Sequence, residues 1–232
     1  MNESQLTEIR NYLLSKKLPI DILIEVNDHF ISQISDVQRE ENLSFKDAFE
    51  KTKENWKEEL KTTVPFYVLA NKDKGAITNF EKKIRQEENF SVLKTSSLIT
   101  LAYFISYIIA VKFYKIDNQR LYTLPILIFP FIVIFYNLIF NRIFYKKKYQ
   151  NLRFSIFHWR IYFIFSFGYF GLQYIKPINK VIENINQNNF NFETIIKTFI
   201  FFLLVLGYTY TGIAQLKFAK TVKKIKPFLK YL

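Results

Sequence analysis

The 232-residue chain contains no cysteine and only five glycines. The absence of cysteine excludes disulfide bonds, thiolate metal ligands and cysteine nucleophiles. Five scattered glycines leave nothing from which to build a glycine-rich loop for nucleotide phosphates. The two histidines, His29 and His158, belong to no His-x-x-x-His or Glu-x-x-His pattern. We therefore expect no catalytic residue, no metal site and no cofactor, and a protein that is not an enzyme.

Acidic residues become scarce beyond residue 60. Residues 1–60 hold 13 acidic and 8 basic side chains, a net charge of −5, whereas the remainder holds 7 acidic and 25 basic side chains, a net charge of +18. A basic surplus can indicate nucleic-acid binding. Here the surplus lies between apolar stretches and in the carboxyl-terminal tail, where membrane proteins carry their lysines and arginines. We therefore expect contact with membrane lipid and no binding of nucleic acid.

Four long apolar stretches follow one another in the second half of the chain, and none contains Asp or Glu. They cover residues 95–114, 121–143, 154–175 and 196–216. A helix of this length crosses a hydrocarbon layer of about 30 Å at about 1.5 Å per residue. The sequence thus predicts four transmembrane helices within residues 95–218 and a basic tail over residues 219–232. The polar amino terminus predicts no signal peptide, so the first stretch would direct membrane insertion.

The distribution of lysine and arginine predicts the orientation of these spans. The segment before the first span, the segment between the second and third, and the tail together carry fifteen Lys and Arg residues, whereas the two alternate segments carry six. Positively charged segments of membrane proteins stay in the cytoplasm. Both termini are therefore expected on the cytoplasmic side.

Several polar side chains within the predicted spans are candidates for a functional role: Asn137, His158, Arg160, Gln173, Tyr208 and Gln215. Arg160 is costly in hydrocarbon, but it lies about two turns from the cytoplasmic end of its span and its side chain can extend to the headgroups. The other groups can hydrogen-bond between helices, at about 1 kcal/mol each, or line a polar path. Pro125 and Pro130 are expected to kink the second span and to place it inside the bundle.

Three amphipathic segments precede the apolar half. Apolar residues recur at a spacing of three or four over residues 4–16, 19–37 and 45–60, which predicts three helices. Ser44 begins a Ser-Phe-Lys-Asp sequence typical of a helix amino terminus, with Asp47 in the place of the usual Glu or Gln. Residues 1–60 are therefore expected to form a small cytoplasmic module. The predicted fold class is all-α, a three-helix module followed by a four-helix transmembrane bundle.

Residues 61–94 are expected to connect the module to the first span. Residues 64–70 are apolar but too short to cross a membrane, and residues 79–93 have the pattern of a charged helix. This helix carries Phe80 and Ile84 on one side and basic residues on another. It is therefore expected either to lie on the bilayer surface or to be a solvated connector.

The second predicted helix carries acidic residues away from its apolar stripe, at Glu25, Asp28 and Asp36. A solvated helix face is the simplest interpretation of these three residues. They also form a candidate partner-binding face, because the acidic module could meet a basic partner.

The pattern of a short helix, a longer helix containing Asn27-Asp-His-Phe30, and the sequence Ser44-Phe-Lys-Asp-Ala-Phe49 leading to Trp56 resembles the HAAS-type helical domain. The resemblance covers about residues 4–60. The chain departs from the family where Lys53-Glu-Asn-Trp56 stands in place of a common Gly-Asp-Pro turn. Domains of this type head multi-pass bacterial membrane proteins and are associated with PadR-like repressors. The resemblance implies a regulatory or adaptor protein of the bacterial inner membrane, without an active site.

Three functions are compatible with these observations. The first is a regulatory or adaptor protein, or an accessory subunit, whose module binds another protein or a second copy of the chain. The second is a small transporter or channel, based on the kinked second span and the polar residues of the spans; the lack of Asp and Glu there argues against proton coupling. The third is an enzyme acting on lipid through His158 and Arg160, on which no other residue converges. We expect the first.

Overall fold

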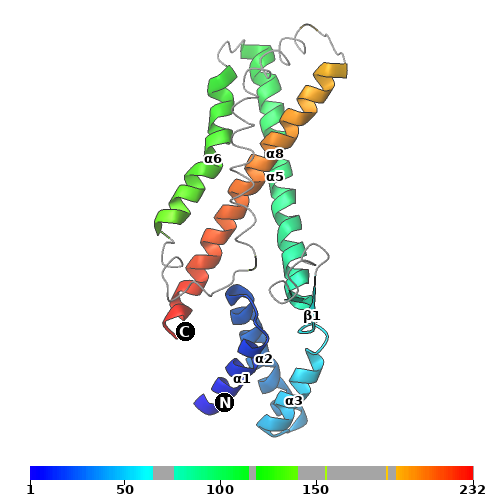
Figure 1. The fold of residues 1–232 in the computed structure, drawn as a ribbon, viewed down its shortest axis with the longest axis vertical. Helices are drawn as coiled ribbons and strands as arrows, with labels where there is room; N and C mark the ends of the chain where they lie inside the picture. Colours follow the sequence, from blue (N-terminus) through cyan, green and yellow to red (C-terminus); the bar gives the residue numbers. More distant parts are fainter. Residues whose placement is uncertain (65–75, 115–118, 141–154, 156–186, 188–191, 232) are drawn as a thin grey trace. The chain divides into compact units, whose positions relative to one another are not determined.

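The structure is a computed structural model of the whole chain, and it describes residues 1–64, 76–114, 119–140, 155, 187 and 192–231. The described chain is mostly helical, which confirms the helical fold class (Figure 1). It divides into two compact units. Unit 1 contains Met1–Glu88, Lys148–Ser155 and Ile225–Leu232, and unit 2 contains Asn89–Lys147 and Ile156–Lys224.

Unit 1 begins with three helices, α1 (Glu3–Ser15), α2 (Ile20–Glu41) and α3 (Phe45–Asn55). Asn2 and Gln5 form a reciprocal capping box at the start of α1. The α2 helix extends beyond the predicted end at Val37 and stops at Asn42, whose left-handed backbone (φ 52°) terminates helices. Ser44 caps α3 as predicted, because its Oγ accepts a hydrogen bond from the Asp47 backbone N–H (3.3 Å).

The core of the module is built from one apolar stripe of each helix. Its members are Ile9 and Leu13 from α1, Ile22, Leu23, Val26, Phe30 and Ile34 from α2, and Ala48 and Phe49 from α3, all buried. Aromatic rings link the three helices, since the Tyr12 ring lies 5.8 Å from those of both Phe30 and Phe49. The buried residues are those whose spacing of three or four predicts the helices, so the sequence pattern and the observed packing agree.

A short hairpin follows the module. Strand β1 (Thr62–Thr63) pairs antiparallel with β2 (Ile77–Thr78), with Thr62 opposite Thr78. Directly after β2 begins α5 (Asn79–Tyr114), a single helix of 36 residues. The sequence predicts two elements here, a connector helix and a first span, but the structure has one continuous helix. No glycine or proline interrupts residues 79–114, so nothing breaks the backbone hydrogen-bond ladder.

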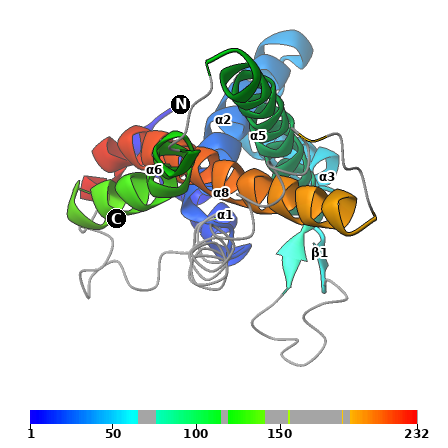
Figure 2. The same cartoon turned by 90° about the horizontal axis from the view of Figure 1, so that it is seen from above.

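In unit 2, three helices pack against one another: α5, α6 (Gln119–Phe140) and α8 (Phe192–Ile225) (Figures 1 and 2). Thr100 bonds Thr209, and the Phe104 ring lies 5.3 Å from that of Phe201, so α5 and α8 are antiparallel. On α6, the Phe131 ring lies 6.3 Å from that of Tyr208 on α8. Further along both helices Asn137 bonds Gln215, so α6 and α8 run in the same direction.

Two described helices are long and apolar enough to cross a membrane, over Asn79–Ala110 and Ile195–Phe228. They carry large apolar side chains on their outer surfaces, for example Ile105 on α5 (60% exposed) and Phe199 on α8 (59% exposed). The second predicted span, residues 121–143, overlaps α6, which contains Pro125 and Pro130. The apolar part of α6, Leu124–Phe140, is shorter than the two helices that are long enough to cross a membrane. The third predicted span, residues 154–175, lies outside the described residues apart from Ser155.

Candidate functional site: the junction of the module and α5

The start of α5 is anchored in the turn that follows α3. The backbone N–H groups of Asn79 and Phe80 donate to the carbonyl oxygens of Lys61 (3.0 Å) and Glu59 (2.8 Å). The Asn79 side-chain amide donates to the Glu58 carbonyl oxygen (2.8 Å). The first N–H groups of a helix have no partner within the helix. Carbonyl groups of the module supply those partners here, so the module itself forms the amino-terminal cap of α5.

Trp56 forms the apolar part of this junction. Its ring lies 5.3 Å from that of Phe30 on α2 and 5.3 Å from that of Phe80 on α5. Its indole N–H donates to Oε1 of Gln33 (2.6 Å), so the polar group of this buried side chain is satisfied. One side chain therefore connects α2 with the first turn of α5.

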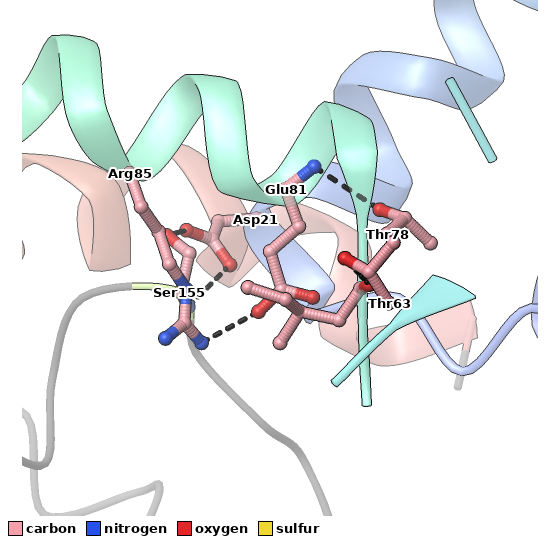
Figure 3. Close-up of polar contacts among 7 residues, drawn as sticks. Asp21, Thr63, Thr78, Glu81, Arg85 and Ser155 are labelled. Carbon is pink, nitrogen blue, oxygen red and sulfur yellow. Dashed lines mark hydrogen bonds and ion pairs between the residues drawn. The ribbon is translucent and has the colours of Figure 1, made fainter. Parts of the chain in front are cut away.

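A buried ion pair lies one turn further along α5 (Figure 3). Glu81 is fully buried, and one of its carboxylate oxygens lies 2.5 Å from the Arg85 guanidinium. The Glu81 backbone N–H donates to Thr78 Oγ1 (3.0 Å), which caps the helix. A buried carboxylate that loses its cation is strongly destabilising. The pair therefore holds Arg85 and the first turns of α5 in one arrangement.

Asp21 connects α2 to a distant part of the sequence (Figure 3). Its carboxylate accepts hydrogen bonds from the backbone N–H of Ser155 (3.1 Å) and from the Ser155 hydroxyl. Ser155 itself is buried. Ser155 lies at the predicted start of the third span. Within unit 1 the module therefore contacts two segments that adjoin predicted spans, the start of α5 and Ser155.

The junction is built from backbone hydrogen bonds, packed aromatic rings and a buried ion pair. Within the described residues, no group of three or more His, Cys, Asp or Glu side chains could hold a metal ion. A pocket of about 450 Å³ lies beside Tyr12 on the module. Ion pairs link several of its charged side chains, including Lys53 with Glu50 (2.6 Å) and Lys57 with Glu54 (2.8 Å).

Asn137 and Gln215, two of the predicted polar residues, are brought together in unit 2. The Asn137 side-chain amide donates to both the backbone oxygen and Oε1 of Gln215, each at 3.0 Å, and both residues are buried. Tyr208 is buried against Phe131 of α6. His158, Arg160 and Gln173 lie outside the described residues.

The predicted partner-binding face lies along α2. Asp28 is exposed, Glu25 is half-buried, and Asp36 forms an ion pair with Arg39 (2.8 Å). Because Arg39 balances the charge of Asp36, a partner would meet more negative charge at Glu25 and Asp28 than at Asp36.

Three contacts within the two units were not predicted from the sequence. The buried hydrogen bond between Thr100 and Thr209 (2.9 Å) has no signal in the sequence beyond two threonines in apolar stretches. The Thr78 cap of α5 has a signal, because Thr78-x-x-Glu81 is a capping-box signature, although only the start of the helix at residue 79 was predicted. The bond from Asp21 to Ser155 joins residues too distant in sequence for any local pattern to indicate it.

Comparison of the chain with protein-family models, with curated proteins and with solved structures finds no match.

Proposed function

We propose that the protein is an integral membrane regulator or adaptor, or an accessory subunit of a membrane complex. Its amino-terminal helical module binds a protein partner, or a second copy of the chain, in the cytoplasm. The observation that carries this proposal is the junction: a helix long and apolar enough for a membrane begins inside the hydrogen-bond network of the module. A partner that alters the packing around Trp56 would alter the anchoring of α5. The resemblance to HAAS-type domains supports the same function.

We propose a topology of four spans in the bacterial inner membrane, with both termini in the cytoplasm. The direction of the helices supports it. The four-span topology requires its second and fourth spans to run in the same direction, and α6 and α8 are parallel. The predicted third span, residues 154–175, has the length of a membrane-spanning helix. The lysine and arginine distribution supports the orientation.

The polar residues of unit 2 support a packing role better than a transport path. Asn137 is hydrogen-bonded to Gln215, and Thr100 is hydrogen-bonded to Thr209. Buried polar pairs of this kind hold helices together in hydrocarbon. A transporter needs polar groups that face a water-filled path. We therefore place the function in the module.

Purification of the tagged full-length chain in mild detergent, followed by quantitative mass spectrometry, tests this proposal. The informative variant is Glu25→Lys/Asp28→Lys, which reverses charge on the candidate face while leaving the core unchanged. The matched control is Glu3→Lys/Glu8→Lys, which reverses two exposed charges on α1. We expect a stoichiometric partner with the wild type and the control, and at least tenfold less with the α2 variant. Absence of any stoichiometric partner of the wild type would refute the proposal.

A further inference from the structure

The carboxyl-terminal turns of α8 carry a basic surface whose position suggests a ligand. Residues 198–216 contain no charged side chain, and Lys217 follows immediately. From Thr194 to the last residue the sequence contains no Asp or Glu, while six lysines occur between residues 217 and 230. The change from an uncharged to a purely cationic helix is therefore abrupt.

The packing of α8 fixes the direction of these lysines. Phe218 and Val222 are both buried, at 4% and 0% exposure. At about 100° per residue, Lys220, Lys223 and Lys224 fall within about 100° of one another on the opposite side of the helix. All three are exposed, and they form no ion pair with any other residue that the structure describes. We call these three residues the α8 lysine surface.

Contacts between α8 and α5 precede the α8 lysine surface along α8. Lys217 Nζ donates to Ser91 Oγ (3.0 Å), and the Tyr210 hydroxyl donates to Asn89 Oδ1 (3.2 Å). On α5, Phe90 next to Asn89 is 70% exposed, and Lys94 is exposed one turn later. Lysine side chains at the end of a long apolar stretch, such as Lys94 and Lys217, are typical of the boundary between hydrocarbon and headgroups.

From these observations we infer that the α8 lysine surface binds the headgroups of anionic phospholipids. At about 1.5 Å per residue, Lys220 to Lys224 lie about 6 to 12 Å beyond Leu216, the last residue of the uncharged stretch. The headgroup region begins at the edge of the hydrocarbon core and is several ångströms thick. Flexible lysine side chains can extend to phosphate oxygens at that depth. The inference rests on the proposed membrane insertion and adds a lipid preference to it.

The test measures lipid binding by the full-length protein in detergent with native mass spectrometry. The probes are phosphatidylglycerol, which is anionic, and phosphatidylcholine, which is zwitterionic. The variant is Lys220→Gln/Lys223→Gln/Lys224→Gln, and the matched control replaces three exposed lysines of the module, Lys46, Lys57 and Lys61, by Gln. Each lysine near an anionic surface strengthens binding about fivefold. We therefore expect at least a tenfold loss of phosphatidylglycerol binding in the α8 variant alone, with phosphatidylcholine binding unchanged.

Two results would overturn the inference. One is equal binding of both lipids by the wild type, and the other is an undiminished phosphatidylglycerol preference in the α8 variant. Failure of the membrane proposal is a different result, because the protein would then leave the membrane fraction during alkaline carbonate extraction. Wild type and variant that both resist this extraction, without a lipid preference, would refute the lipid inference alone.

Discussion

Replacement of Trp56 by Ala should release the start of α5 from the module. Trp56 is nearly buried and contacts Phe30 and Phe80 through its ring and Gln33 through its indole N–H. Removal of a buried tryptophan side chain costs about 3–5 kcal/mol. That is a large part of the roughly 5–15 kcal/mol that stabilises a typical domain. The cost falls on unit 1, where these contacts lie.

Hydrogen–deuterium exchange of the full-length protein in lipid nanodiscs would measure this effect. A loss of about 3 kcal/mol corresponds to a rise of about a hundredfold in exchange by local opening. We expect that rise for the amides of residues 79–88, whose first two N–H groups are capped by the turn after α3. Amides near Thr100, which is bonded to α8 within unit 2, should change little.

Two variants sharpen the interpretation. Trp56→Phe keeps an aromatic ring against Phe80 but removes the N–H donor, so its effect should be nearer to about 1 kcal/mol. Phe90→Ala removes an aromatic side chain of α5 that is 70% exposed, and it should leave exchange of residues 79–88 unchanged. Unaltered exchange of residues 79–88 in Trp56→Ala would refute the junction as described.

Three further outcomes follow from the packing of both units. A Cβ at Gly212 would overlap the ring of Phe129, so Gly212→Ala should lower the thermal stability of the protein in detergent. Adding Phe129→Ala should restore part of the loss. Unchanged thermal stability in Gly212→Ala would contradict this packing. Asn137→Leu should cost about 1 kcal/mol, and a double-mutant cycle with Gln215→Leu should reveal coupling, whereas additive effects would disprove the bond. Burial raises the pKa of Tyr12 above its ordinary value of 10.0, so the folded state holds this proton more tightly than the unfolded state. The contribution of Tyr12 to the free energy of unfolding is therefore fully present below pH 10 and decreases as the pH rises further. Tyr12→Phe should lack this decrease when the free energy of unfolding is measured against pH, and identical pH dependence in the two proteins would count against it.

Local signals account for what the sequence predicts correctly about the module. The stripe through Val26, Phe30 and Ile34 on α2 and the cap at Ser44 depend on residues a few positions apart, so periodicity and capping chemistry reveal them. The end of α2 at Glu41 was missed because it is determined by a left-handed Asn42, which composition does not distinguish from any other polar break.

Long-range features could not be predicted in the same way. The continuity of α5 through residue 94 follows from the absence of a helix breaker, but the change from charged to apolar composition there suggested a boundary. The pairing of Asn137 with Gln215 depends on the direction and register of α6 and α8, which no single helix encodes. The sequence shows both residues as polar groups in apolar stretches, a pattern that fits either hydrogen bonds between helices or a polar path.

Labelling of single cysteines in living cells tests the proposed topology most directly. Because the chain has no cysteine, each introduced thiol reports alone. Suitable positions are Ser32 on α2, Gln187 before α8 and Lys220 on α8, all exposed. We predict that a membrane-impermeant maleimide labels Gln187→Cys in intact cells, and labels Ser32→Cys and Lys220→Cys only after permeabilisation. Labelling of Ser32→Cys from outside, or equal labelling at all three positions, would contradict a cytoplasmic module on a multi-pass membrane protein.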